Sequence, residues 1–138
     1  MMMASLEGGL AFQKGLGAVH ALSHPLGGLR DPVLHHGTLN AVFLPAVLRF
    51  NANAAADKYR ELRAAMGLAA GDDPAAAVAE LNQRLGLPAS LAAMGVPESV
   101  LPKIAEAAVN EHCTATNPRR VTAPDYLALL EESFGAKN

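Results

Sequence analysis

GLGAVHALSHPLGGLRDPVLHHGTLNAVFLPAVLRFN, the stretch from Gly15 to Asn51, contains four of the five histidines of this 138-residue chain. His20 and His24 are four residues apart, so a helix here would place both on one face, about 6 Å apart along its axis. After a turn-forming segment, His35 and His36 begin a second run with helical periodicity. Imidazole is a good ligand for divalent metals, and ligands on rigid elements can converge on one point. Any chemistry of this chain is therefore expected where these two helices meet.

Each histidine also has a simpler interpretation. A histidine pair on an apolar helix is more often a packed, hydrogen-bonded part of the core, and a His-His-Gly turn is often only solvated. The zinc-protease pattern requires Glu after the first histidine, but Ala21 stands there, which excludes that pattern. The four histidines nevertheless fall within 17 positions, and the other 121 positions hold one. This concentration indicates a site, although it does not specify a reaction.

The helix after these histidines has the clearest pattern of the chain. Its apolar residues follow helical spacing and form a wide stripe: Leu39, Val42, Phe43, Ala46, Val47 and Phe50. Seven helices are expected in all, over residues 5–14, 15–26, 37–51, 54–66, 74–85, 101–111 and 122–134, with a short turn at 88–94. Pro25 should kink or end the second helix near His24, and Pro45 should kink the third. No segment alternates with a period of two, so the expected fold is a single all-α domain.

Composition excludes several classes of protein. Apolar residues make up 51% of the chain and aromatic residues only 4%, so Leu, Ala and Val must build the core. A net charge of −2 with both signs mixed gives no basis for binding nucleic acid or an anionic membrane. The single cysteine excludes an internal disulfide. The first residues lack the features of a secretory signal, and no run resembles a membrane span. We expect a cytoplasmic protein.

Two motifs carry a resemblance to a known family. The first is His20-Ala-Leu-Ser-His24-Pro-Leu-Gly-Gly followed by His36-Gly-Thr-Leu-Asn-Ala-Val-Phe-Leu-Pro, and the second is Cys113-Thr-Ala-Thr-Asn-Pro-Arg followed by Val-Thr. In this order they resemble the C-terminal half of the iron-containing (group III) alcohol dehydrogenases, and the resemblance covers about Ser5 to Phe134. It implies the helical C-terminal domain of the iron-containing alcohol dehydrogenase and dehydroquinate synthase-like fold.

The resemblance also implies roles for the histidines. His20 and His36 match the two metal-binding histidines of the family's helical domain, where Fe²⁺ or Zn²⁺ would bind. His24 matches the histidine beside the nicotinamide and the substrate, which is linked to proton movement. His35 stands where the family often has proline, so either His35 or His36 could be the second ligand; the glycine that follows His36 favours His36.

The sequence departs from the family in what surrounds these motifs. The only G-x-G is Gly15-Leu-Gly17, with His20 in the position of the third glycine, so residues 1–138 contain no dinucleotide-binding loop. We therefore expect this chain to be the helical metal-binding domain of a partial protein, an NAD(P)-dependent alcohol or aldehyde oxidoreductase that is inactive as these residues alone. The alternative is a free-standing helical module that self-associates or binds metal weakly without catalysis.

A surface argument predicts self-association. The histidines are accompanied by apolar residues that would be exposed: Leu16, Leu26, Leu29, Val33 and Leu34. Exposed apolar patches usually mark interaction surfaces, and one patch can pair with its own copy around a two-fold axis. We expect a homodimer whose contact lies between residues 16 and 34.

Three smaller candidates complete the set. His112 and Cys113 could form a thiolate–imidazole pair, but adjacent side chains point apart on a helix, which argues against it. Asp31 could be a third metal ligand, although Asp before Pro is common in turns. Asn117 and the two arginines after it could bind phosphate, although a structural turn fits them better, with Asn117 bonded to backbone and the arginines paired with carboxylates.

Overall fold

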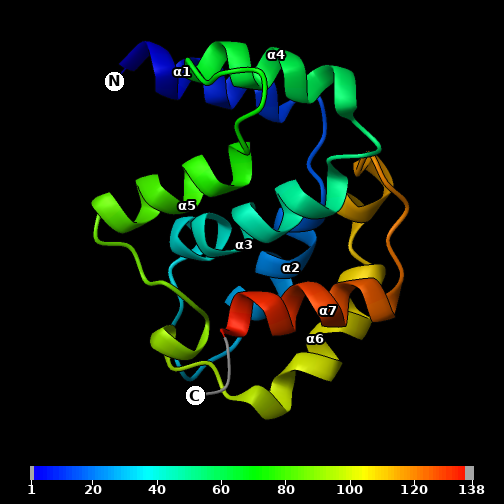
Figure 1. Ribbon diagram of the computed structural model, residues 1–138. Coiled ribbons are helices and arrows are strands. Elements are labelled where there is room, and N and C mark those ends of the chain that lie inside the picture. The colour runs from blue at the N-terminus through cyan, green and yellow to red at the C-terminus, as the bar shows by residue number, and fades with distance from the viewer. Residues whose placement is uncertain (1, 136–138) are drawn as a thin grey trace.

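The computed structural model describes residues 2–135, which form seven α-helices and three short 3₁₀ turns (Figure 1). The elements in chain order are α1 (Met2–Phe12), α2 (Ala18–Gly27), α3 (His36–Asn51), α4 (Ala56–Met66), α5 (Pro74–Arg84), η1 (Ala92–Met94), η2 (Glu98–Val100), α6 (Leu101–Val109), η3 (His112–Thr116) and α7 (Ala123–Phe134). No strand occurs in the described part of the chain, and the expected all-α fold of about seven helices is confirmed. No helix among residues 2–135 is long and apolar enough to cross a membrane.

Helix α2 lies at the centre of this arrangement, packed against α3, α6 and α7 (Figure 1). Its inward face is fully buried, with Leu22 and Leu26 at 0% exposure. They join a core to which α3 contributes Leu39 and Phe43 and α7 contributes Tyr126. Burying each side chain of this size contributes roughly 1.5–3 kcal/mol. The helix that carries His20 and His24 is therefore held on several sides.

Of the two effects expected of Pro25, a kink or an end of the helix near His24, the end does not occur, because α2 continues through Pro25 to Gly27. A proline inside a helix removes one N–H and leaves the carbonyl four residues earlier without its partner. In α3, Pro45 leaves the carbonyl of Ala41 in this position, and the Asn82 side chain of α5 donates a hydrogen bond to it at 2.7 Å. Another helix thus replaces a hydrogen bond that the proline removes.

The apolar patch expected between residues 16 and 34 is not exposed as predicted. Leu26 is completely buried, and Leu16, Leu29 and Leu34 are partly buried against the core. Only Val33 stays open, at 90% exposure. The prediction failed because the loop after α2 folds back onto the core.

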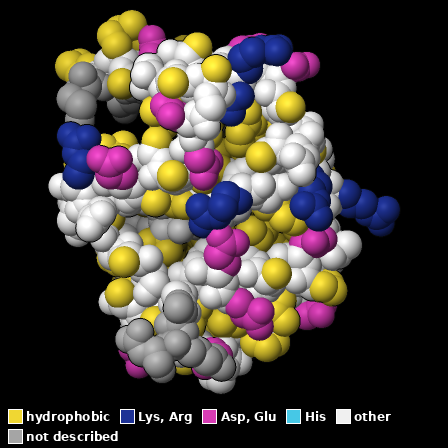
Figure 2. Space-filling view, viewed as in Figure 1, with side chains coloured by type: hydrophobic (Ala, Val, Ile, Leu, Met, Phe, Trp, Pro, Cys, Tyr) yellow, Lys and Arg dark blue, Asp and Glu magenta, His cyan; other side chains and the backbone are white. Residues whose placement is uncertain are grey.

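Exposed apolar side chains gather instead on α1, which buries no residue. Leu6, Leu10 and Phe12 are 56%, 62% and 55% exposed, and Met2 and Met3 are more exposed still. Figure 2 shows hydrophobic side chains at the end of the molecule where α1 lies. No segment among residues 2–135 buries these side chains of α1.

One amide ties three segments together. Asn117 Oδ1 accepts hydrogen bonds from the backbone N–H of Ala18 at 3.1 Å and from Asn51 Nδ2 at 3.0 Å. Its Nδ2 donates to Asn51 Oδ1 at 2.9 Å and to the carbonyl of Arg119 at 2.6 Å. The start of α2, the end of α3 and the loop before α7 thereby meet at one side chain. Gly17 allows this approach, since a Cβ there would lie 2.9 Å from Asn117 Oδ1.

The structural turn expected around Asn117 is what the structure shows. The guanidinium of Arg119 lies 3.7 Å from a carboxylate oxygen of Asp125 and 3.9 Å from the ring centroid of Phe50. Asp125 also forms a capping box with Thr122 at the start of α7. These contacts account for Asn117 and Arg119 without a phosphate ligand, whereas Arg120 is exposed.

Replacing Asn117 with Ala should lower the free energy of unfolding by about 1–3 kcal/mol, because it leaves the amide of the nearly buried Asn51 and the N–H of Ala18 without partners. Urea denaturation followed by circular dichroism measures this. The matched control is Arg120→Ala at an exposed position of the same loop, which should change stability by less than about 0.5 kcal/mol. Equal midpoints for the two variants would contradict the role given to Asn117.

Candidate functional site

Three histidines from two helices meet at the interface of α2 and α3. The ring centroid of His20 lies 5.7 Å from that of His24 and 5.3 Å from that of His36. The rings of His24 and His36 are stacked, with centroids 5.5 Å apart. The i, i+4 spacing on α2 and the position of His36 at the first residue of α3 produce this arrangement.

Asn40 shows where two of these imidazoles point. Its Nδ2 donates hydrogen bonds to Nε2 of His20 at 3.2 Å and to Nε2 of His36 at 3.1 Å. Both Nε2 atoms therefore present lone pairs toward one position. Asn40 Oδ1 is buried and has no hydrogen-bond partner. Asn40 was not selected from the sequence, although its i, i+4 spacing from His36 was a usable signal.

This donor set fits a divalent metal ion in part. Neutral imidazole nitrogens that face one point are suitable ligands, and the unpartnered Asn40 Oδ1 shows that the polar groups here are not mutually satisfied. Metal centres usually have three or four protein ligands, so His20 and His36 supply only some of them. Burial lowers the pKa of His20, and His36 and His24 lower it further. That direction favours the neutral imidazole, which is the form that binds metal.

His35 has a different role in this geometry. It is the N-cap residue of α3, and its Nδ1 accepts a hydrogen bond from the backbone N–H of Thr38 at 3.3 Å. Between the two candidates for the second ligand, the geometry favours His36, because that ring lies against His20. Asp31 has no contact with the histidines within residues 2–135, and its side chain is exposed.

His24 has a partner that was not expected from the sequence. Its Nδ1 lies 3.0 Å from a carboxylate oxygen of Glu111, just after α6. The two residues are 87 positions apart, so no local pattern could have indicated the pair. A carboxylate that accepts a hydrogen bond from Nδ1–H holds the imidazole in one tautomer. The Nε2 atom is then left as a lone-pair acceptor.

The argument against contact between His112 and Cys113 was wrong, since Cys113 Sγ lies 3.4 Å from His112 Nε2. Adjacent side chains point apart on an α-helix, but the backbone of Glu111 is extended here and the residues after it form the 3₁₀ turn η3. Cys113 is 1% exposed, and burial, with a contribution from Glu111, raises the pKa of its thiol. A thiol in this state is a poor nucleophile on its own.

A pocket of about 530 Å³ opens beside His20 and Asn40, between the start of α2, α3 and the loop at Thr116–Pro118. Its wall is mainly apolar and includes Leu16, Val19, Leu44 and Val47. Binding pockets commonly combine an apolar wall with a few polar groups at one place. The histidine cluster thus borders a space where a small molecule or another protein segment fits.

Proteins similar to this chain in sequence include dehydrogenases and reductases. Residues 1–134 match the C-terminal region of the Fe-containing alcohol dehydrogenase family. A 4-hydroxybutyrate dehydrogenase of Cupriavidus necator is 54% identical, over 97% of this chain and 37% of that protein. A lactaldehyde reductase of Escherichia coli K12 is 36% identical, again over 97% of this chain and 37% of that protein.

Solved structures agree in fold. A crystal structure of 1,3-propanediol oxidoreductase superposes with a TM-score of 0.80 at 34% identity, covering 86% of this chain and 33% of that one. An alcohol dehydrogenase from Oenococcus oeni gives a TM-score of 0.77 at 30% identity, covering 86% of this chain and 33% of that one. The chain therefore spans little more than a third of its relatives. It belongs to the iron-containing alcohol dehydrogenase family and corresponds to the C-terminal, helical part of its members.

Proposed function

We propose that this chain is the metal-binding part of an NAD(P)-dependent alcohol or aldehyde oxidoreductase, with His20 and His36 as two ligands of a divalent cation. The observation that carries the proposal is the direction of the two Nε2 atoms, which both face the Asn40 amide. A cation bound where that amide N–H now lies would face the Nε2 lone pairs of both His20 and His36. Fe²⁺ is the expected ion because of the family, and Zn²⁺ accepts the same ligands.

A bound Fe²⁺ or Zn²⁺ would polarise the oxygen of the alcohol or aldehyde. The residues of this chain have other tasks. Packing within α2 and α3 holds the two imidazoles in place, and the Asn40 amide donates a hydrogen bond to both Nε2 atoms. The hydride would pass to or from NAD(P), which we propose is bound by residues outside the printed sequence, because residues 1–138 contain no dinucleotide loop.

His24 is the proposed proton carrier of this site. Glu111 accepts a hydrogen bond from its Nδ1–H, so Nε2 is the atom free to exchange a proton with a substrate oxygen. The His24 ring lies against that of His36, 5.5 Å between centroids, which places it next to the proposed metal position. Glu111 acts through His24 and does not itself need to touch the substrate.

The substrate class follows from the relatives. Their names specify 4-hydroxybutyrate, lactaldehyde and 1,3-propanediol, all small and polar. Because the 4-hydroxybutyrate dehydrogenase is 54% identical, we propose 4-hydroxybutyrate as the first compound to assay.

A second candidate function, self-association, is favoured by one observation. Helix α1 exposes Leu6, Leu10 and Phe12 to solvent, and this surface has the apolar character of an interface. A homodimer thus stays a prediction, but its expected contact moves from residues 16–34 to α1.

Titration of the purified 138-residue chain with Fe²⁺ by calorimetry should show binding weaker than micromolar, because two neutral ligands do not complete a site. His20→Ala and His36→Ala should each remove this binding event. His35→Asn is the matched control: it deletes a neighbouring imidazole but keeps a side chain that caps α3, so binding should persist. Isotherms unchanged by both alanine variants would refute the assignment of these ligands.

A chimera tests the enzymatic role. This chain would replace the matching C-terminal 37% of the Cupriavidus necator 4-hydroxybutyrate dehydrogenase. The chimera should oxidise 4-hydroxybutyrate with NAD(P), and His36→Ala within it should lower kcat/KM by at least about a hundredfold, whereas His35→Asn should not. The 138-residue chain alone should give no NADH fluorescence enhancement. The proposal would be contradicted by a folded chimera without activity. It would also be contradicted by an active chimera whose kcat/KM is unchanged by His36→Ala.

Light scattering coupled to size exclusion tests association. At tens of micromolar, the chain should have a mass above the monomer value of 14.3 kDa. The double variant Leu6→Glu, Leu10→Glu should return it to the monomer without loss of helicity, because α1 contributes nothing to the buried core. A monomer mass for the unmodified chain would rule out association through α1.

A further inference from the structure

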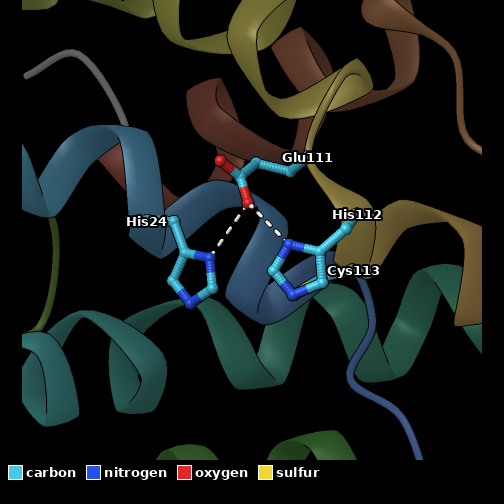
Figure 3. A group of neighbouring side chains, drawn as sticks. All are labelled: His24, Glu111, His112 and Cys113. Carbon is cyan, nitrogen blue, oxygen red and sulfur yellow. Dashed lines mark hydrogen bonds and ion pairs between the residues drawn. The ribbon is translucent and has the colours of Figure 1, made fainter.

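Four potential metal ligands, His24 among them, lie close together next to the histidine site. His24 comes from α2, and Glu111, His112 and Cys113 come from the segment between α6 and α7 (Figure 3). One ligand atom from each residue lies within 4.8 Å of the others. These four residues form the thiol cluster.

The distances within the thiol cluster are close to those of a coordination site. Glu111 Oε2 lies 3.0 Å from His24 Nδ1 and 3.6 Å from His112 Nδ1. Figure 3 shows the Glu111 carboxylate reaching toward both imidazoles. In a tetrahedral zinc site with bonds of about 2.0–2.3 Å, ligand atoms are roughly 3.3–3.8 Å apart. Movements of about 1 Å in side chains would therefore complete the site.

The charge balance also favours a cation. Among residues 2–135, Glu111 forms no ion pair with Lys or Arg, and its contacts are with the two imidazoles. Its side chain is only 29% exposed, so this carboxylate is partly removed from water without a permanent positive partner. A divalent cation would supply that partner and would stabilise the Cys113 thiolate.

A cation can also reach these ligands. His112 is 81% exposed, so its ring can turn toward an entering ion, whereas Cys113 is buried at the closed end. A thiolate, two imidazoles and a carboxylate form a donor set typical of Zn²⁺ and Co²⁺ rather than of Mg²⁺ or Ca²⁺.

We propose that His24, Glu111, His112 and Cys113 bind a soft divalent cation, Zn²⁺ or a metal of similar preference, at a second site distinct from the one assigned to His20 and His36. Occupation moves His24 Nδ1 from its hydrogen bond with Glu111 to the cation. The site is made only of residues of this chain, so it does not depend on the proposed enzymatic function.

Cobalt provides a specific test, because only the thiolate gives a strong near-ultraviolet charge-transfer band with Co²⁺ and the chain has a single cysteine. Titration of the reduced 138-residue chain with Co²⁺ should produce this band, saturating at one equivalent, and Zn²⁺ should abolish it by displacement. His36→Ala should leave the band intact, which separates this site from the first one.

The ligand variants decide between a built site and incidental thiol binding. His112→Ala and Glu111→Gln should each weaken Co²⁺ binding by about tenfold or more, and Cys113→Ser should remove the band. His112→Ala alters an exposed side chain and preserves the fold, so it tests the proposal even if Cys113→Ser unfolds the protein. Absence of the band in the folded, reduced chain would overturn the proposal. So would a band of equal affinity in the His112 and Glu111 variants.

Discussion

The hydrogen bonds of Asn117 are the constraint on which the rest of this structure depends. They connect residues that are 99 and 66 positions apart in the sequence, at the beginning of α2 and the end of α3. The neighbouring Thr116 hydroxyl donates to the carbonyl of Leu16, which fixes the same segment a second time. Because α2 starts at this point, its rotation about its own axis is set there, and so is the direction in which His20 and His24 face. The histidine site is therefore a consequence of a contact made by the opposite end of the chain.

The two sides of His24 give the site its asymmetry. On one side its ring stacks on His36, close to the Asn40 amide where two lone pairs converge. At the ring edge its Nδ1 meets the only carboxylate that contacts the histidines within residues 2–135, that of Glu111. A single imidazole thus separates a nitrogen-rich environment from one that contains a carboxylate and a thiol. Both roles proposed for His24, proton movement in the first environment and metal binding in the second, rest on this position.

Sequence reasoning identified the helices because their signals are local. The apolar stripe of α3, the Asp73 cap of α5 and the Thr122 capping box of α7 each depend on residues within a few positions. The i, i+4 spacing placed His20 beside His24, and the position of His36 at the start of the next helix predicted its convergence with them. Glu111 could not be found in this way, because its contact with His24 crosses 87 positions and depends on how α6 packs against α2. The burial of Leu26 was missed for the same reason, because it is set by the helices that pack against α2.

The most direct test of this account is a crystal structure of the chain soaked in Fe²⁺, with anomalous difference density measured at the iron edge. The account predicts a peak within coordinating distance of Nε2 of both His20 and His36, with the Asn40 amide no longer bridging the two rings. Iron found only elsewhere on the molecule, with the Asn40 bridge intact, would contradict it.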